Sequence, residues 1–155
     1  MTYDRGPRTA GAGGTALPDA ATLKKIIEHD DPETLITWAE TIGNGLARNE
    51  RLTTSQMRGF FGMVRQIEAE ADADSQRTDQ LPSKLYRRLI LLKPKLAYQA
   101  ERDRESRKGE GVLRLQQVLS PSIDLVQRDR TQFKRFVEFF EAILAYHKAA
   151  GGRES

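Results

Sequence analysis

The chain has 155 residues, no cysteine, 38% hydrophobic and 30% charged residues, and a formal net charge of +3. This composition is typical of one globular domain, and it excludes disulfides and thiolate metal sites. No segment approaches the roughly 20 apolar residues of a membrane span, and no apolar signal segment opens the chain, so we expect a cytoplasmic protein. An isoelectric point near 9.3 permits nucleic-acid binding without requiring it.

The N-terminal region predicts a tail and one short helix. Residues 1–16 contain five glycine or proline residues and almost nothing apolar, which predicts a disordered tail. Asp19 can cap a helix that runs to Glu28 and buries three aliphatic side chains. We therefore expect residues 17–152 to form the folded domain.

A second helix has a clear start signal. Asp31, Pro32 and Glu33 supply a capping carboxylate, a proline at the first helical position and an acid in the first turn. Two glycines weaken its second half, so its end is predicted between residues 43 and 49. The helical spacing of Trp38 favours a core residue over a base-stacking platform.

The third predicted helix begins at a capping box formed by Thr53 and Gln56 and runs to about Glu70. The face opposite its apolar stripe combines small and polar residues with two arginines: Ser55, Arg58, Gly59, Gly62, Arg65, Gln66 and Ala69. Interior glycines cost helix stability, about 1 kcal/mol each relative to alanine. Their presence predicts a close approach to this backbone, either by another helix or by a phosphate chain.

Residues 83–108 concentrate the positive charge of the chain. They hold nine Lys or Arg and three acids, so the remaining residues carry a net charge of −3. The predicted helix has one apolar stripe: Leu85, Leu89, Leu92 and Leu96. A different face is cationic, with Lys84, Arg88, Lys95 and Arg102 in line and with Arg87 and Tyr98 at its margin. A cationic row of this length suits a polyanion, although a solvated helix face would have the same pattern; Pro94 should kink or divide the helix.

The C-terminal third predicts two further helices. Residues 101–111 have mixed charge and predict a frayed helix end and a mobile loop. A helix over 112–119 should be interrupted at Pro121, and the last helix should span 131–149 and stop at the Gly151–Gly152 pair. No segment alternates with period two, so we predict an all-α compact bundle of about five to six helices behind the disordered tail.

The residue types needed for catalysis are scarce. The two histidines are His29, in an acidic segment that capping explains better than metal binding, and His147, which the helical spacing places in a core or interface. No nucleophile, Walker or dinucleotide motif occurs in the sequence. We therefore expect no enzyme activity, no metal and no cofactor.

Three motifs in series carry a family resemblance. They are LTTSQMRGF at 52–60, KPKLAYQAER at 93–102 and FFEAILAYHKAAGG at 139–152. In order and spacing they resemble the small subunit of the type III-A CRISPR–Cas effector, the Csm complex, over roughly residues 35–152. Glu101 departs from the family pattern, which more often has glycine before the arginine.

The resemblance implies a helical antiviral-defence subunit that self-associates along the guide RNA, beside the backbone subunits and facing the large subunit. It would stabilise the duplex of guide RNA and target RNA without cutting it. The matching motifs imply RNA contacts at Gln56, Arg58, Lys93, Lys95 and Arg102. The basic helix faces add Arg65 and Tyr98 as candidates, whereas Tyr146, His147 and Lys148 of the third motif suit packing or contact equally.

Three other functions remain open at this stage. The chain could be a structural assembly subunit whose basic faces meet acidic faces of its neighbours, such as the face that carries Asp30, Asp31 and Glu33. A DNA-binding helix-turn-helix is disfavoured, because no short helix pair with a tight glycine turn presents base-reading residues. A membrane-surface helix is disfavoured too, because the core needs the apolar stripe.

Overall fold

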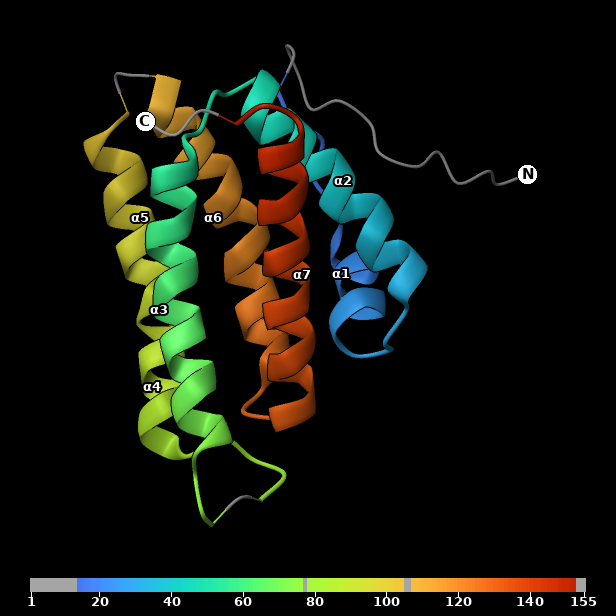
Figure 1. The fold of residues 1–155 in the computed structure, drawn as a ribbon, viewed down its shortest axis with the longest axis vertical. Helices are drawn as coiled ribbons and strands as arrows, with labels where there is room; N and C mark the ends of the chain where they lie inside the picture. The colour runs from blue at the N-terminus through green and yellow to red at the C-terminus, as the bar shows by residue number, and fades with distance from the viewer. Residues whose placement is uncertain (1–13, 77, 105–106, 153–155) are drawn as a thin grey trace.

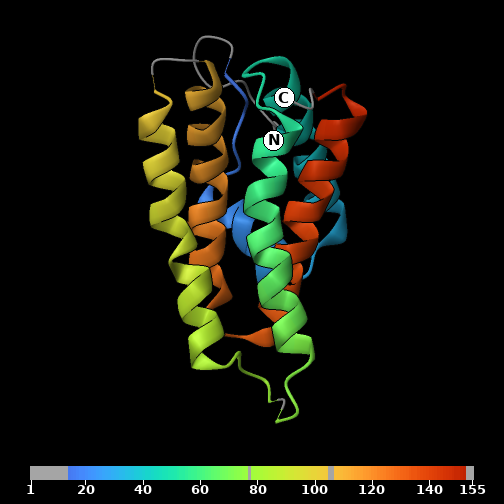
Figure 2. The same cartoon turned by 60° about the vertical axis from the view of Figure 1, so that its left-hand side comes forward.

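The computed structural model describes residues 14–76, 78–104 and 107–152, apart from the side chains of residues 107–109. These residues form seven helices: α1 (Ala20–Ile27), α2 (Pro32–Arg48), α3 (Thr54–Asp72), α4 (Ser83–Ile90), α5 (Leu92–Arg102), α6 (Arg107–Val126) and α7 (Arg130–Ala149). Gln80 and Asp129 form an isolated β-bridge, and no strand occurs in the described part of the chain. The predicted all-α class is confirmed, and α4 and α5 form one column that counts as a single bent helix in a six-helix bundle (Figures 1 and 2).

The C-terminal helix α7 is the centre of the core. It packs against α1, α2, α3 and α6, and Figure 1 shows it between α2 on one side and α3 on the other. Four phenylalanines of α7 are completely buried: Phe133, Phe136, Phe139 and Phe140. Gly43 lets α2 approach α7 closely, because a Cβ at this position would lie 2.6 Å from the backbone oxygen of Ile143.

The predicted starts of α2 and α3 are confirmed, whereas α6 begins at Arg107, so the loop predicted over residues 101–111 is wrong for residues 107–111. The Asp31 carboxylate accepts a hydrogen bond from the Thr34 N–H at 3.1 Å, with Pro32 in the first turn of α2. Thr53 and Gln56 form the capping box of α3. At the other end of the chain, Gly151 follows α7 with φ +92°, a conformation that glycine adopts without strain.

The two helix prolines have different effects. Pro94 lacks the N–H that a continuous helix would direct at the carbonyl of Ile90, and the chain divides at Leu91, between α4 and α5. The prediction of a division is thus confirmed. The predicted interruption at Pro121 is wrong, since α6 continues through it to Val126. Apolar side chains on both sides of Pro121 are fully buried, and this packing holds the helix together.

The predicted disordered tail lies outside the described residues for positions 1–13. For its last residues the prediction is wrong, because Thr15 and Ala16 are buried. The Thr15 N–H donates to Oε2 of Glu50 at 3.0 Å, its hydroxyl donates to Oε1, and Nε of Arg114 lies 4.0 Å from the same carboxylate. Glu50 is thereby held inside the fold by partners that are distant in sequence.

Of the helices described, none is both long and apolar enough to cross a lipid bilayer.

Candidate nucleic-acid interface

A groove runs between α3 on one side and the α4–α5 column on the other. Helix α3 packs on α4 and α7, whereas α5 packs mainly on α6, so α3 and α5 separate along their length (Figure 2). Two adjoining hollows form this α3–α5 groove. The inner hollow, of about 160 Å³, is lined by Met63, Gln66, Ile67, Arg88, Leu91, Leu92 and Lys95. The outer hollow, of about 420 Å³, is lined by Phe60, Met63, Pro94, Lys95, Tyr98 and Gln99.

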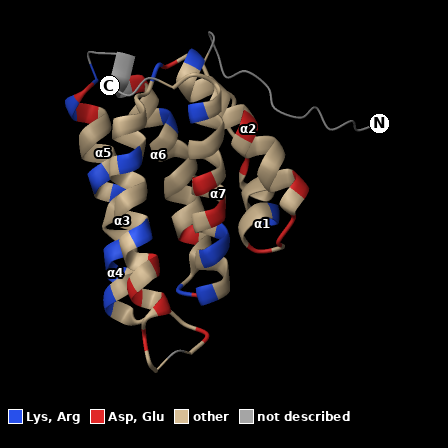
Figure 3. Cartoon of the chain, in the orientation of Figure 1, with Lys and Arg blue, Asp and Glu red and all other residues tan. Residues whose placement is uncertain are grey.

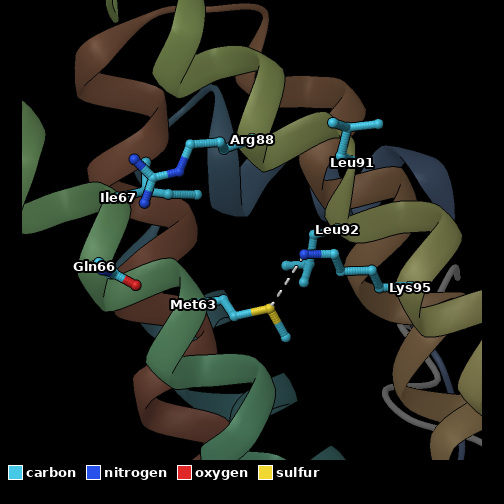
Figure 4. Close-up of a pocket in the computed structure, with 7 residues that line it drawn as sticks. All are labelled: Met63, Gln66, Ile67, Arg88, Leu91, Leu92 and Lys95. Atoms are coloured by element: carbon cyan, nitrogen blue, oxygen red, sulfur yellow. Dashed lines mark hydrogen bonds between the residues drawn. The ribbon is translucent and has the colours of Figure 1, made fainter.

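Cationic side chains cross the inner hollow. Figure 4 shows the Lys95 side chain reaching back from α5 toward Met63 of α3, with 3.9 Å between Nζ and Sδ. Arg88 extends from α4 toward α3, where its Nη1 lies 2.9 Å from Oε1 of Glu70. The groove therefore has an apolar floor and two cationic side chains at its rim, of which Arg88 is paired with Glu70.

The outward face of α5 presents three of the predicted RNA contacts together. Lys95, Tyr98 and Arg102 follow each other at helical spacings of three and four, and all three are exposed. Tyr98 is 66% exposed, which is unusual for so large an aromatic ring. Nε of Arg102 lies 3.6 Å from Oδ1 of Asp103, an ion pair in solvent that is worth little and is easily exchanged.

Lys93 lies apart from these residues. Its ammonium group lies 2.5 Å from Oδ1 of Asp124, on the side of α5 that faces α6. To contact RNA, Lys93 would have to leave this ion pair. The structure thus groups Lys95 with Arg88, as the helical wheel predicted, and separates both from Lys93.

Gln56 connects the start of α3 to the end of α5. Its Oε1 accepts from the Thr53 N–H at 3.5 Å, and its Nε2 donates to Oδ2 of Asp103 at 3.5 Å. Gln99 donates to the same Asp103 oxygen at 2.7 Å. The first role of Gln56 is therefore to cap a helix next to the groove, close to Arg102.

Arg58 and Arg65 lie on the outer face of α3. Nη1 of Arg65 lies 2.9 Å from Oε1 of Glu68, and its guanidinium carbon lies 5.9 Å from the centre of the Phe61 ring, near α7. Arg58 is exposed on the same helix. Neither arginine lines the groove, so the seven predicted contacts do not form one continuous patch.

The glycines of α3 face open space. A Cβ added to Gly59 or Gly62 would meet no described atom within 4 Å. The close approach that these residues predict is thus not made by another helix within the described part of the chain.

The charge is distributed asymmetrically over the molecule. Residues 83–102 hold six Lys or Arg and one Glu, a net charge of +5, whereas residues 19–33 hold two Lys and five acids, a net charge of −3. Figure 3 shows blue residues along α3, α4 and α5, and red residues around the α1–α2 connection on the opposite side. This asymmetry gives the groove side a field that attracts anions.

His147 is a core residue. Its ring is completely buried, Nε2 lies 2.6 Å from the carbonyl oxygen of Leu52, and Nδ1 has no hydrogen-bond partner among the described residues. The Leu52 carbonyl can accept only from a protonated Nε2, and burial lowers the pKa of His147 below its usual range, which favours the neutral ring. No group of three or more His, Asp or Glu in the described ranges could hold a metal ion.

Sequence reasoning missed part of the groove. Among the residues that line the groove but are not predicted contacts are Arg88, Met63 and Gln99. The sequence did contain a signal for the α4–α5 wall of the groove. Gln99 follows Lys95 by four residues, and Arg88 lies on the same face of the helical wheel. The sequence contains no signal for the α3 wall of the groove, because this wall depends on how two helices distant in sequence pack.

The fold and the groove define a small all-helical protein with a cationic surface on one side. A family model described as Csm2 Type III-A matches residues 29–153. The chain therefore belongs to this family and is a small subunit of the type III-A Csm complex, as its three motifs indicated. No curated protein and no solved structure matches it.

Proposed function

We propose that this protein is a non-catalytic RNA-binding subunit that multimerises along the guide RNA in the cytoplasm. It contacts the backbone and large subunits of the effector and stabilises the duplex of guide and target RNA. The observation that carries this proposal is the concentration of positive charge along α4 and α5, next to a groove whose rim includes Lys95 and Arg88.

The chemistry of these side chains favours recognition of the RNA backbone. The sequence of a guide changes from one complex to the next, so a subunit that follows it must bind phosphate and sugar rather than base edges. Lys95 and Arg102 are exposed cations on one helix face and suit phosphate groups. Gly59 and Gly62 leave the α3 backbone open to a phosphate chain.

A second function is supported by the charge asymmetry. The acidic segment 19–33 of one copy is complementary to the basic segment 83–102 of another. In this alternative the protein is a structural assembly subunit, and its basic face is covered by a neighbour with little direct RNA binding.

Binding of the isolated protein to short RNAs over a range of salt concentrations separates the two functions. An RNA-binding subunit shows weak, sequence-independent affinity that decreases steeply with salt, because each neutralised phosphate releases counterions. A purely structural subunit shows no measurable affinity even at low salt and instead associates with itself.

A further inference from the structure

We propose that the outer hollow of the groove is a pocket for one unpaired RNA base. This inference rests on the proposed function, since it needs an RNA on the groove side. It adds a requirement that backbone recognition does not have, because a base that is paired and stacked inside a duplex cannot enter a pocket.

The lining of the hollow has the properties of a base-stacking site. Pro94 and Tyr98 lie on one side, on α5, and Phe60 and Met63 lie on the other, on α3. Its volume of about 420 Å³ is within the usual range of small-ligand pockets, about 300–1,000 Å³. Phe60 is 7% exposed and belongs to the core, whereas Tyr98 leaves most of its ring in solvent. An exposed aromatic ring at the wall of an apolar pocket is a platform on which any base can stack.

The charges around the hollow select the ligand. Lys95 lines the hollow, and Arg102 lies one helical turn beyond Tyr98 on the same helix, so two exposed cations of α5 lie on either side of Tyr98 along the helix. An aliphatic side chain of a partner protein gains nothing from these cations. A nucleotide uses both parts of the site, because its base is apolar on its faces and its phosphates are anionic.

The amide of Gln99 adds a polar group at the edge of the pocket. Its Nε2 is used by Asp103, at 2.7 Å, and this hydrogen bond fixes the orientation of the side chain. A fixed amide beside a stacking surface contacts the edge of a base without enforcing one base identity, because the stacking surface carries most of the affinity. The pocket is therefore expected to accept every base and to prefer the larger purines.

The test compares three RNA duplexes that differ at one position: fully paired, with one bulged adenine, and with an abasic nucleotide at the bulge. Full-length protein should bind the adenine bulge about 5- to 150-fold more tightly than the abasic bulge, the factor that stacking on an aromatic side chain provides. In Tyr98→Ala the ratio of these two affinities should fall to about one, and in Tyr98→Phe it should persist, because the ring is retained. Ile36→Ala is the matched control, since Ile36 is an exposed apolar residue of α2, and it should keep the wild-type ratio.

A second readout is the fluorescence of 2-aminopurine placed at the bulge. Wild-type protein should quench it by stacking, and Tyr98→Ala should not. Equal affinity for the adenine and abasic bulges, or a ratio that survives in Tyr98→Ala, overturns the pocket and leaves backbone binding intact. Absence of salt-dependent binding to all three duplexes overturns the pocket and the proposed function together.

Discussion

Charge reversal on the outward face of α5 tests the proposed function at its most exposed residues. In the variant Lys95→Glu/Arg102→Glu, two cations that face solvent become anions. Both residues are exposed, and the ion pair that Arg102 forms joins it to the adjacent Asp103, so we expect the fold to be retained. Thermal unfolding followed by circular dichroism checks this expectation.

The magnitude follows from counterion release. Each lost phosphate contact on single-stranded RNA lowers the salt slope of log K by about 0.7, so two contacts lower it by about 1.4. At 0.1 M salt this corresponds to an affinity about 25-fold weaker than that of the wild type, before any repulsion from the new carboxylates. Fluorescence anisotropy with a labelled RNA, titrated at several salt concentrations, measures both quantities.

The matched control reverses the same number of positive charges at a site far from α5 in the sequence. Lys24 and Lys25 are exposed on α1, so Lys24→Glu/Lys25→Glu has the same net charge as the α5 variant. If a local site binds RNA, the control keeps most of the wild-type salt slope. Equal losses of affinity and slope in the two variants would refute the reasoning, because they would show a general effect of net charge.

Three further predictions concern the stability of the fold. Gly43→Ala should lower the free energy of unfolding by about 1–3 kcal/mol, because the new methyl group meets the backbone of α7. Gly59→Ala should raise it by up to about 1 kcal/mol, because its methyl group enters open space and alanine favours the helix. Urea unfolding that gives changes of the same sign for both variants would contradict this packing. Because burial lowers the pKa of His147, the unfolded state takes up its proton first, and stability should fall as the pH drops below about 6.5, by at most about 1.4 kcal/mol per pH unit. In His147→Gln the urea midpoint should no longer show this part of the pH dependence. If the midpoint of the variant varied with pH as that of the wild type does, the result would argue against a neutral buried ring. Arg130→Ala should lower the free energy of unfolding by about 3 kcal/mol or more, because the buried guanidinium donates to the backbone oxygens of residues 71, 78 and 80. A loss below about 1 kcal/mol in the same urea assay would show that other contacts hold residues 71–80 in place.

Local signals predicted the starts of α2 and α3, and these predictions hold. The Asp31 cap and the Thr53–Gln56 box act within one helical turn, so no distant residue can change them. The stop after α7 depends on glycine at position 151 and is equally local. The all-α class followed from the same patterns.

Features that depend on distant residues were not predictable from the sequence. The continuation of α6 through Pro121 depends on core packing, and the burial of Thr15 depends on Glu50, 35 residues away. The place of Lys93 depends on Asp124, a partner in another helix. The helical wheel grouped Arg88 with Lys95 correctly because α4 and α5 keep nearly the same register across Leu91.

The candidate interface was also only partly predictable from the sequence. The sequence pattern indicated the α5 half of the groove, where Lys95, Tyr98 and Arg102 share a face. The α3 half forms because α3 packs on α7 while α5 packs on α6. Only the packed structure shows this arrangement. The RNA contacts at Arg58 and Arg65 stay predictions, and they require a second RNA-facing surface on the other side of α3.

Crosslinking within the assembled effector tests the central claim most directly. After ultraviolet irradiation of the complex purified with its guide RNA and bound target, mass spectrometry identifies the peptides of this subunit that carry a nucleotide. We predict crosslinks within residues 83–102, with Tyr98 among the modified residues. A complex that contains this subunit and both RNAs, but gives crosslinks only in its other subunits, would contradict the account and favour a purely structural role.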